Sequence, residues 1–251
     1  MRKVNVTVFF LLLIAILFYI VPANADDKKP LCTGKHHFGI VCNPNNNDFN
    51  NPEKVTSQLK ELGVKLAICQ LSWKDVEVEK VKFSEEGWKT YDEIVQKLTG
   101  SGIDVMCIVS AIPQWAKKGA GAGKEEKNGE KITDPSDLVT FVSIAAGRYK
   151  DKIRYWALFN SPQSDKHWFE PKHLVELYRV GSKAIKDVSP RNVIVLAGFE
   201  GIIDKRGAYL EKFLKLGGGK YVDMYYFHMN LGGGAHFSAA ASETNGLKEI
   251  L

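Results

Sequence analysis

The sequence lacks several patterns that would point to a common class of ligand. It contains no Cys-x-x-Cys pair, which argues against a zinc site, and no Gly-x-Gly-x-x-Gly after its first predicted strand, which argues against a dinucleotide. No run of Lys and Arg is interleaved with aromatic residues, and the formal net charge is a modest +5, so nucleic acid is not an expected partner. We therefore expect neither a metal nor a cofactor.

Cysteines are few as well, at four: Cys32, Cys42, Cys69 and Cys107. If the chain leaves the cytoplasm, disulfides are permitted, and four cysteines allow three full pairings, among which the sequence does not choose. Three of the four lie in apolar, strand-like runs. At those positions we favour a buried thiol that packs as a small hydrophobic group.

The first 25 residues have the pattern of an export signal. Arg2 and Lys3 precede an apolar run over residues 8–21, and Pro22 and Ala23-Asn24-Ala25 supply a break and a cleavage site. The run is shorter than the about 20 residues of a membrane span, so we favour cleavage before Asp26 over an uncleaved anchor. The mature chain would carry a net charge of +3, would be secreted or periplasmic, and would have no membrane partner.

Short apolar runs alternate with amphipathic stretches along the rest of the chain. Strands are predicted at residues 38–41, 64–71, 103–109, 153–159, 193–196 and 222–227. Helices are predicted at residues 52–62, 85–98, 135–149, 171–185 and 206–216, with another near 239–251 and a surface loop at 117–131. Ser84 and Asp134-Pro135 mark two of the helix starts. The strands are apolar on both faces, which is typical of a parallel sheet covered by helices, as in a (β/α)8 barrel or a doubly wound sheet.

Four stretches carry a resemblance to a known family. They are Leu62-Gly63-Val64-Lys65 with Leu71-Ser72-Trp73, then Ile112-Pro113-Gln114-Trp115-Ala116, then residues 148–156 leading into Phe159-Asn160-Ser161-Pro162-Gln163, and finally residues 223–228. In order and spacing they resemble clan A glycoside hydrolases, nearest to the β-xylosidase and α-iduronidase (family 39-like) group. The resemblance implies an α/β fold of the (β/α)8 TIM-barrel type over residues 36–251, after a lead-in at 26–35. It also implies a carbohydrate, an oligo- or polysaccharide, as the ligand.

The chain departs from this family where the chemistry is done. The family's fourth strand ends in Trp-Asn-Glu-Pro, in which the Asn holds a sugar hydroxyl and the Glu is the general acid/base. Here Asn160 is kept, but Ser161 stands in place of the Glu, and a serine hydroxyl has no useful acidity for protonating a leaving group. Ile68 replaces an Arg that steadies the nucleophile. About six strand–helix units precede Leu251, so we expect an incomplete barrel without the strand that bears the nucleophile.

Other residues at strand ends are candidates for the site. Glu200 follows the fifth predicted strand and is a weak candidate to replace the missing acid, although a solvated loop carboxylate is the simpler interpretation. Trp73 and Trp115 are candidates to stack on a sugar ring or to pack in the core. The resemblance makes His228 and His37 candidate ligand contacts, with a core histidine as the alternative for His228.

These observations leave several functions open. The favoured hypothesis is a secreted, catalytically impaired carbohydrate-binding relative of O-glycosyl hydrolases. The first alternative is an active glycosidase with relocated carboxylates such as Glu200. The second is a structural or interaction protein that self-associates through open strand edges, because unpaired edges invite strand pairing. The third is a truncated gene product without a stable function.

Overall fold

The computed structural model describes residues 39–42, 51–117, 132–162, 169–200 and 205–228. For residues 39–42, 199–200, 205–207 and 227–228 the description covers the backbone alone. Within these ranges no helix has both the length and the apolar character needed to span a bilayer. The predicted signal segment, the lead-in, the 117–131 loop beyond Lys117 and the predicted helix near 239–251 lie outside the described residues.

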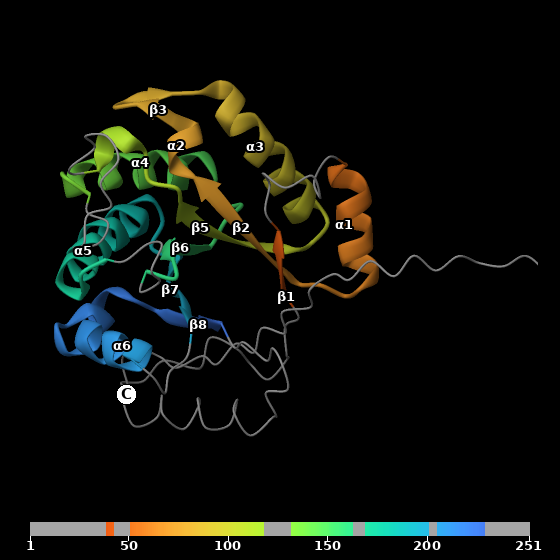
Figure 1. Ribbon diagram of the computed structural model, residues 1–251. Coiled ribbons are helices and arrows are strands. Elements are labelled where there is room, and N and C mark those ends of the chain that lie inside the picture. Colours follow the sequence, from red (N-terminus) through yellow and green to blue (C-terminus); the bar gives the residue numbers. More distant parts are fainter. Residues whose placement is uncertain (1–38, 43–50, 118–131, 163–168, 201–204, 229–251) are drawn as a thin grey trace, which may run out of the picture.

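The six predicted strands form one parallel sheet, in the order β1-β2-β5-β6-β7-β8. These strands are β1 (Gly39–Cys42), β2 (Leu66–Ser72), β5 (Asp104–Ser110), β6 (Tyr155–Asn160), β7 (Val193–Glu200) and β8 (Met224–His228). Each strand therefore pairs with the next one along the chain, apart from the short β3 and β4. Figure 1 shows the helices arranged in an arc around the outside of this sheet. This layout is that of an open (β/α) barrel, as the sequence predicted.

The five predicted helices that lie within the described residues are confirmed, and local signals account for the starts of two of them. They are α1 (Pro52–Glu61), α3 (Glu85–Gly100), α4 (Pro135–Arg148), α5 (Pro171–Val188) and α6 (Lys205–Lys215). The Ser84 hydroxyl accepts a hydrogen bond from the Gly87 amide at the start of α3, and the Asp134 carboxylate accepts one from the Ser136 amide at the start of α4. These caps satisfy amides that have no partner within the helix.

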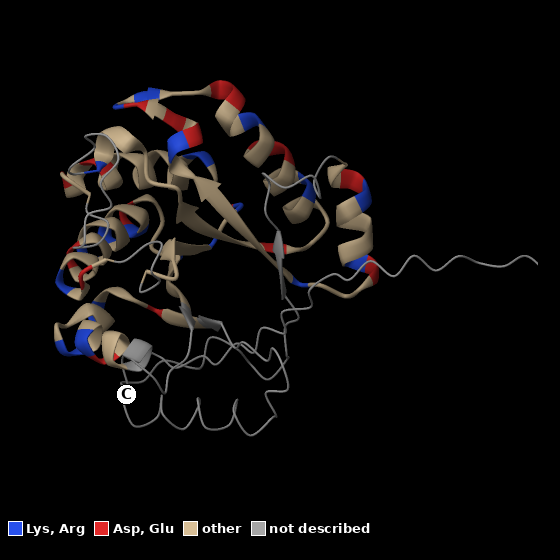
Figure 2. Ribbon diagram, viewed as in Figure 1, with Lys and Arg blue, Asp and Glu red and all other residues tan. Residues whose placement is uncertain are grey.

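The sheet is buried on both faces, which explains why its strands are apolar throughout. One face packs against the helices, and its core includes Leu71, Trp73, Cys69 and Cys107. The other face forms the barrel interior. We call its apolar residues the interior cluster: Leu66, Ile68, Met106, Ile108, Ala157, Val193, Val195, Ala197, Met224 and Tyr226. Figure 2 shows that Lys, Arg, Asp and Glu lie mainly on the helices and are nearly absent from the central strands.

The structure confirms the interpretation of two cysteines and adds a feature that the sequence did not predict. Cys69 and Cys107 are buried thiols and form no disulfide. The unpredicted feature follows β2: a four-residue helix, α2 (Trp73–Val76), leads into a two-stranded hairpin of β3 (Glu77–Glu79) and β4 (Lys82–Phe83). Strands of two or three residues carry no hydrophobic period, so pattern analysis cannot detect them.

Candidate functional site

The carboxyl end of β6 is built from unusual backbone. Phe159 and Ser161 have positive φ angles of 64° and 48°, which place both in the left-handed region. The pairing of β6 with β7 also shifts register between Ala157 and Asn160. A bulky residue at positive φ is uncommon, and such positions tend to gather at functional sites, each at a cost of about 1–3 kcal/mol. The carboxyl end of β6, which holds Asn160 and Ser161, is therefore the leading candidate for a ligand site.

Gly198 of β7 lies directly against this strand end. A Cβ atom added to Gly198 would come within 2.2 Å of Asn160 Oδ1 and 2.4 Å of the Ser161 nitrogen, and Gly198 itself has a φ of +79°. The register of β7 with β8 shifts between Ala197 and Phe199, around the same glycine. Glycine in a strand marks a close backbone approach of this kind. The missing side chain leaves room for the Asn160 amide.

Asn160 has an unmet hydrogen-bonding capacity. Its Oδ1 atom is buried and accepts no hydrogen bond within the part of the chain that the structure describes. An unsatisfied buried acceptor costs about 1–3 kcal/mol and calls for an explanation. Ser161, the next residue, is itself 9% exposed. The unsatisfied acceptor therefore marks the end of β6 as a candidate site.

Two further candidates lie at neighbouring strand ends. Glu200 is the last residue of β7 and His228 the last of β8, and their Cα atoms are partners in the parallel ladder. Both therefore lie at the carboxyl edge of the sheet, where barrel enzymes place their sites, with Glu200 on the strand next to β6 and His228 one strand further. His37 lies outside the described residues.

The two candidate tryptophans, Trp73 and Trp115, differ in their exposure to solvent. Trp73 is 0% exposed, and its ring stacks on Phe141 of α4 with centroids 5.1 Å apart. A fully buried ring has no face to offer a sugar, so the stacking role considered for Trp73 is corrected to a role in the core. Trp115, in the short 3-10 helix after β5 (Gln114–Ala116), is partly exposed and packs edge-on against Trp73.

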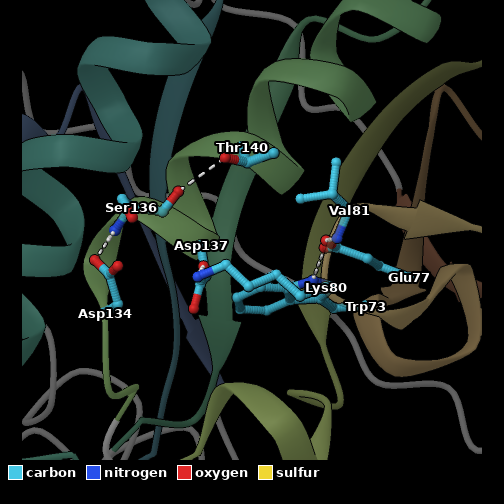
Figure 3. A network of polar contacts seen from close by, with 8 residues as sticks. All are labelled: Trp73, Glu77, Lys80, Val81, Asp134, Ser136, Asp137 and Thr140. Atoms are coloured by element: carbon cyan, nitrogen blue, oxygen red, sulfur yellow. Dashed lines mark hydrogen bonds and ion pairs between the residues drawn. The ribbon is translucent and has the colours of Figure 1, made fainter.

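Sequence reasoning missed a buried carboxylate beside these rings. Glu77 is 1% exposed; its carboxylate accepts hydrogen bonds from Trp73 Nε1 at 2.6 Å and from the Val81 amide at 2.7 Å. Burial raises the pKa of Glu77 above its usual range, and the two hydrogen bonds oppose that rise. Figure 3 shows this group together with Lys80, which pairs with Asp137 of α4 at 2.7 Å. The four-residue spacing of Trp73 and Glu77 is the signal that could have revealed the contact.

Ile68 and the acidic groups bear on what the site can do. Ile68 is 0% exposed and belongs to the interior cluster, so the position that resembles the family's Arg is apolar and faces the barrel interior. Among the residues whose burial the structure describes, the buried carboxylates are Glu77, in the β3–β4 hairpin, and Asp137, in the first turn of α4. No group of three or more His, Cys, Asp or Glu within the described ranges could hold a metal ion.

Comparison with known proteins supports the fold. No protein-family model matches the chain, and no curated protein matches it. Among solved structures, one similar to this chain is a family 39 glycoside hydrolase from the gut symbiont Bacteroides cellulosilyticus WH2. The alignment covers 74% of this chain and 36% of the hydrolase chain, with 21% identity and a TM-score of 0.57. The alignment with a β-glucosidase from Thermotoga maritima covers 61% of this chain and 38% of the β-glucosidase chain, with 15% identity and a TM-score of 0.50.

These matches concern the fold alone, since the identities are low. The chain spans little more than a third of the length of either solved structure. The order of the strands, the parallel ladder and the surrounding helices agree with the resemblance found in the sequence. The described part of the chain thus has the fold of an incomplete (β/α)8 barrel of the type found in clan A glycoside hydrolases.

Proposed function

We propose that this chain is an exported carbohydrate-binding protein that is related to glycoside hydrolases and impaired in catalysis. The observation that carries the proposal is the end of β6, where a partly exposed Asn160 with an unsatisfied Oδ1 is followed by Ser161. The first residue can bind a sugar hydroxyl, and the second cannot protonate a glycosidic oxygen. The signal-like segment over residues 1–25 supports export.

The side chains around the site support the proposal of impaired catalysis. Glycoside hydrolysis by retention needs two carboxyl groups about 5–5.5 Å apart, one of them able to donate a proton. Ser161 lacks that acidity, and proton transfer of this kind contributes about 10²–10⁴-fold to the rate. The apolar Ile68 gives an ionised carboxylate in the interior no partner, and a buried charge without a partner is costly.

The binding proposal is tested by separating affinity from stability. Asn160→Ala removes the proposed contact with the sugar, so it should abolish saccharide binding, measured by calorimetry against a panel of oligosaccharides. Because the lost acceptor makes no bond within the described residues, the free energy of unfolding should change little. Asn192→Ala is the matched control, because Asn192 Nδ2 donates to the Ile185 carbonyl at 2.9 Å in a buried site. It should cost about 1–3 kcal/mol of stability and leave affinity unchanged. Equal affinity of the wild type and Asn160→Ala for every sugar would refute the role of Asn160.

An active glycosidase remains the second candidate, because the backbones of Glu200 and His228 pair at the same edge of the sheet. Turnover of nitrophenyl glycosides above background that disappears in Glu200→Gln would favour that candidate.

Self-association through the outer strands β1 and β8 stays a prediction, and size-exclusion chromatography would show a defined dimer if it occurs.

A further inference from the structure

The indole N–H group of Trp115 is bonded to a residue of the β3–β4 hairpin. Trp115 Nε1 donates a hydrogen bond to the backbone carbonyl of Glu77 at 3.3 Å. The same ring meets Trp73 edge-on, with centroids 5.9 Å apart and an interplanar angle of 89°. Because the N–H group is already used within the protein, the exposed part of Trp115 can offer a ligand a ring surface but no hydrogen-bond donor.

The side chain of Glu77 locks the segment that supplies this carbonyl. One carboxylate oxygen accepts from Trp73 Nε1 at 2.6 Å, which ties Glu77 to the start of α2. The other oxygen accepts from the Val81 amide at 2.7 Å, which ties Glu77 to the turn of the hairpin. Val81 has a positive φ of 62°, a conformation that a β-branched residue adopts only when its surroundings impose it. The carboxylate thus joins this turn to the indole of Trp73, which is fully buried. Figure 3 shows Glu77 together with Val81 and Trp73.

Charged groups around Glu77 fix the hairpin from its outer side. Lys80, in the turn, forms an ion pair with Asp137 of α4 at 2.7 Å, and the side chain of Lys80 is 58% exposed. Asp137 disfavours the ionised form of Glu77 and Lys80 favours it, while burial has the largest effect. Lys80 makes no hydrogen bond to the Glu77 carboxylate among the contacts of the described residues, so the two anchors can be removed one at a time.

We infer that Glu77 is a positioning residue that holds Trp115 as a stacking platform for the apolar face of a pyranose ring. This inference rests on the proposed function. A ring that is fixed before binding loses little freedom when the sugar arrives, which favours affinity. With its N–H satisfied by Glu77, the platform selects for the C–H face of a sugar instead of its hydroxyls.

The test is a double-mutant cycle between Glu77 and Trp115. Glu77→Gln keeps the shape of the side chain but turns one acceptor into an N–H group, so either Trp73 or Val81 loses its acceptor. We expect Glu77→Gln to weaken saccharide binding by roughly tenfold in the wild-type background and to have no further effect on affinity in a Trp115→Ala background. In protein labelled with 5-fluorotryptophan, Glu77→Gln should also shift the ¹⁹F resonance of Trp115, which is identified by its loss in Trp115→Ala.

Lys80→Ala is the matched control, because it breaks the other anchor of the same hairpin and leaves all three hydrogen bonds to Glu77 in place. Its affinity should stay within about twofold of the wild type, with an unmoved Trp115 resonance. If Glu77→Gln does not fold, Trp73→Phe tests the same link, since it removes the donor to Glu77 and keeps a ring against Phe141.

The outcomes separate this inference from the proposed function. Wild-type affinity in Glu77→Gln, or an equal loss of affinity in both backgrounds, overturns the positioning role while carbohydrate binding stands. Failure of every saccharide to bind the wild-type protein overturns the proposed function, and with it the platform, whatever the ¹⁹F spectrum shows.

Discussion

Replacing Gly198 by alanine is a stringent test of how the end of β6 is built. The new Cβ would lie 2.2 Å from Asn160 Oδ1 and 2.4 Å from the Ser161 nitrogen, and the φ of +79° disfavours any residue with a side chain. The left-handed backbone costs about 1–2 kcal/mol, and forcing a methyl group into a packed site costs about 1–3 kcal/mol more. Together these give about 2–5 kcal/mol of lost stability.

Gly63→Ala is the control that isolates the backbone contribution. Gly63 has a similar φ of +72°, but nothing lies within 4 Å of the added Cβ. Its substitution should cost about 1–2 kcal/mol, less any gain from a stiffer unfolded chain. Urea denaturation followed by tryptophan fluorescence measures both free energies of unfolding. If Gly198→Ala costs no more than Gly63→Ala, the close approach of β7 to Asn160 is not a feature of the folded protein.

Two further predictions follow from other contacts. Ser161→Glu alone should not produce hydrolysis of nitrophenyl glycosides, because a single acid lacks the second carboxyl group that retention needs; robust turnover would show that a nucleophile is in place. Asp92 accepts two hydrogen bonds from Arg148, at 2.9 and 2.6 Å, which lower the pKa of Asp92. The stability from this pair is present above the unfolded-state pKa of about 3.9 and is lost as the pH falls through the lower folded-state value. Asp92→Asn should therefore lower the free energy of unfolding by at most about 1 kcal/mol at pH 7. Below pH 4 the free energy of unfolding of the variant, measured by urea titration, should fall less steeply than that of the wild type. An equally steep fall in both proteins would contradict this.

The backbone architecture could be predicted because its signals are local. Ser84 and Asp134 cap the helices that follow them, and the strands are apolar on both faces, as expected between two layers. Asn160 and Ser161 were placed correctly at the end of the fourth strand of the sheet, because that strand's pattern ends there. The hairpin after β2 escaped prediction, because its strands have two and three residues.

The sequence by itself determined the succession of strands and helices, the replacement of the acid by Ser161 and the apolar character at Ile68, since each depends on residue identity and on contacts within a few positions. Only the tertiary structure decided that Trp73 is buried while Trp115 is partly exposed, and that Glu77 joins the two. It also brought Gly198 against Asn160, 38 positions away along the chain. These contacts come from packing between elements that are distant in sequence, and no local pattern records which side chains will meet there.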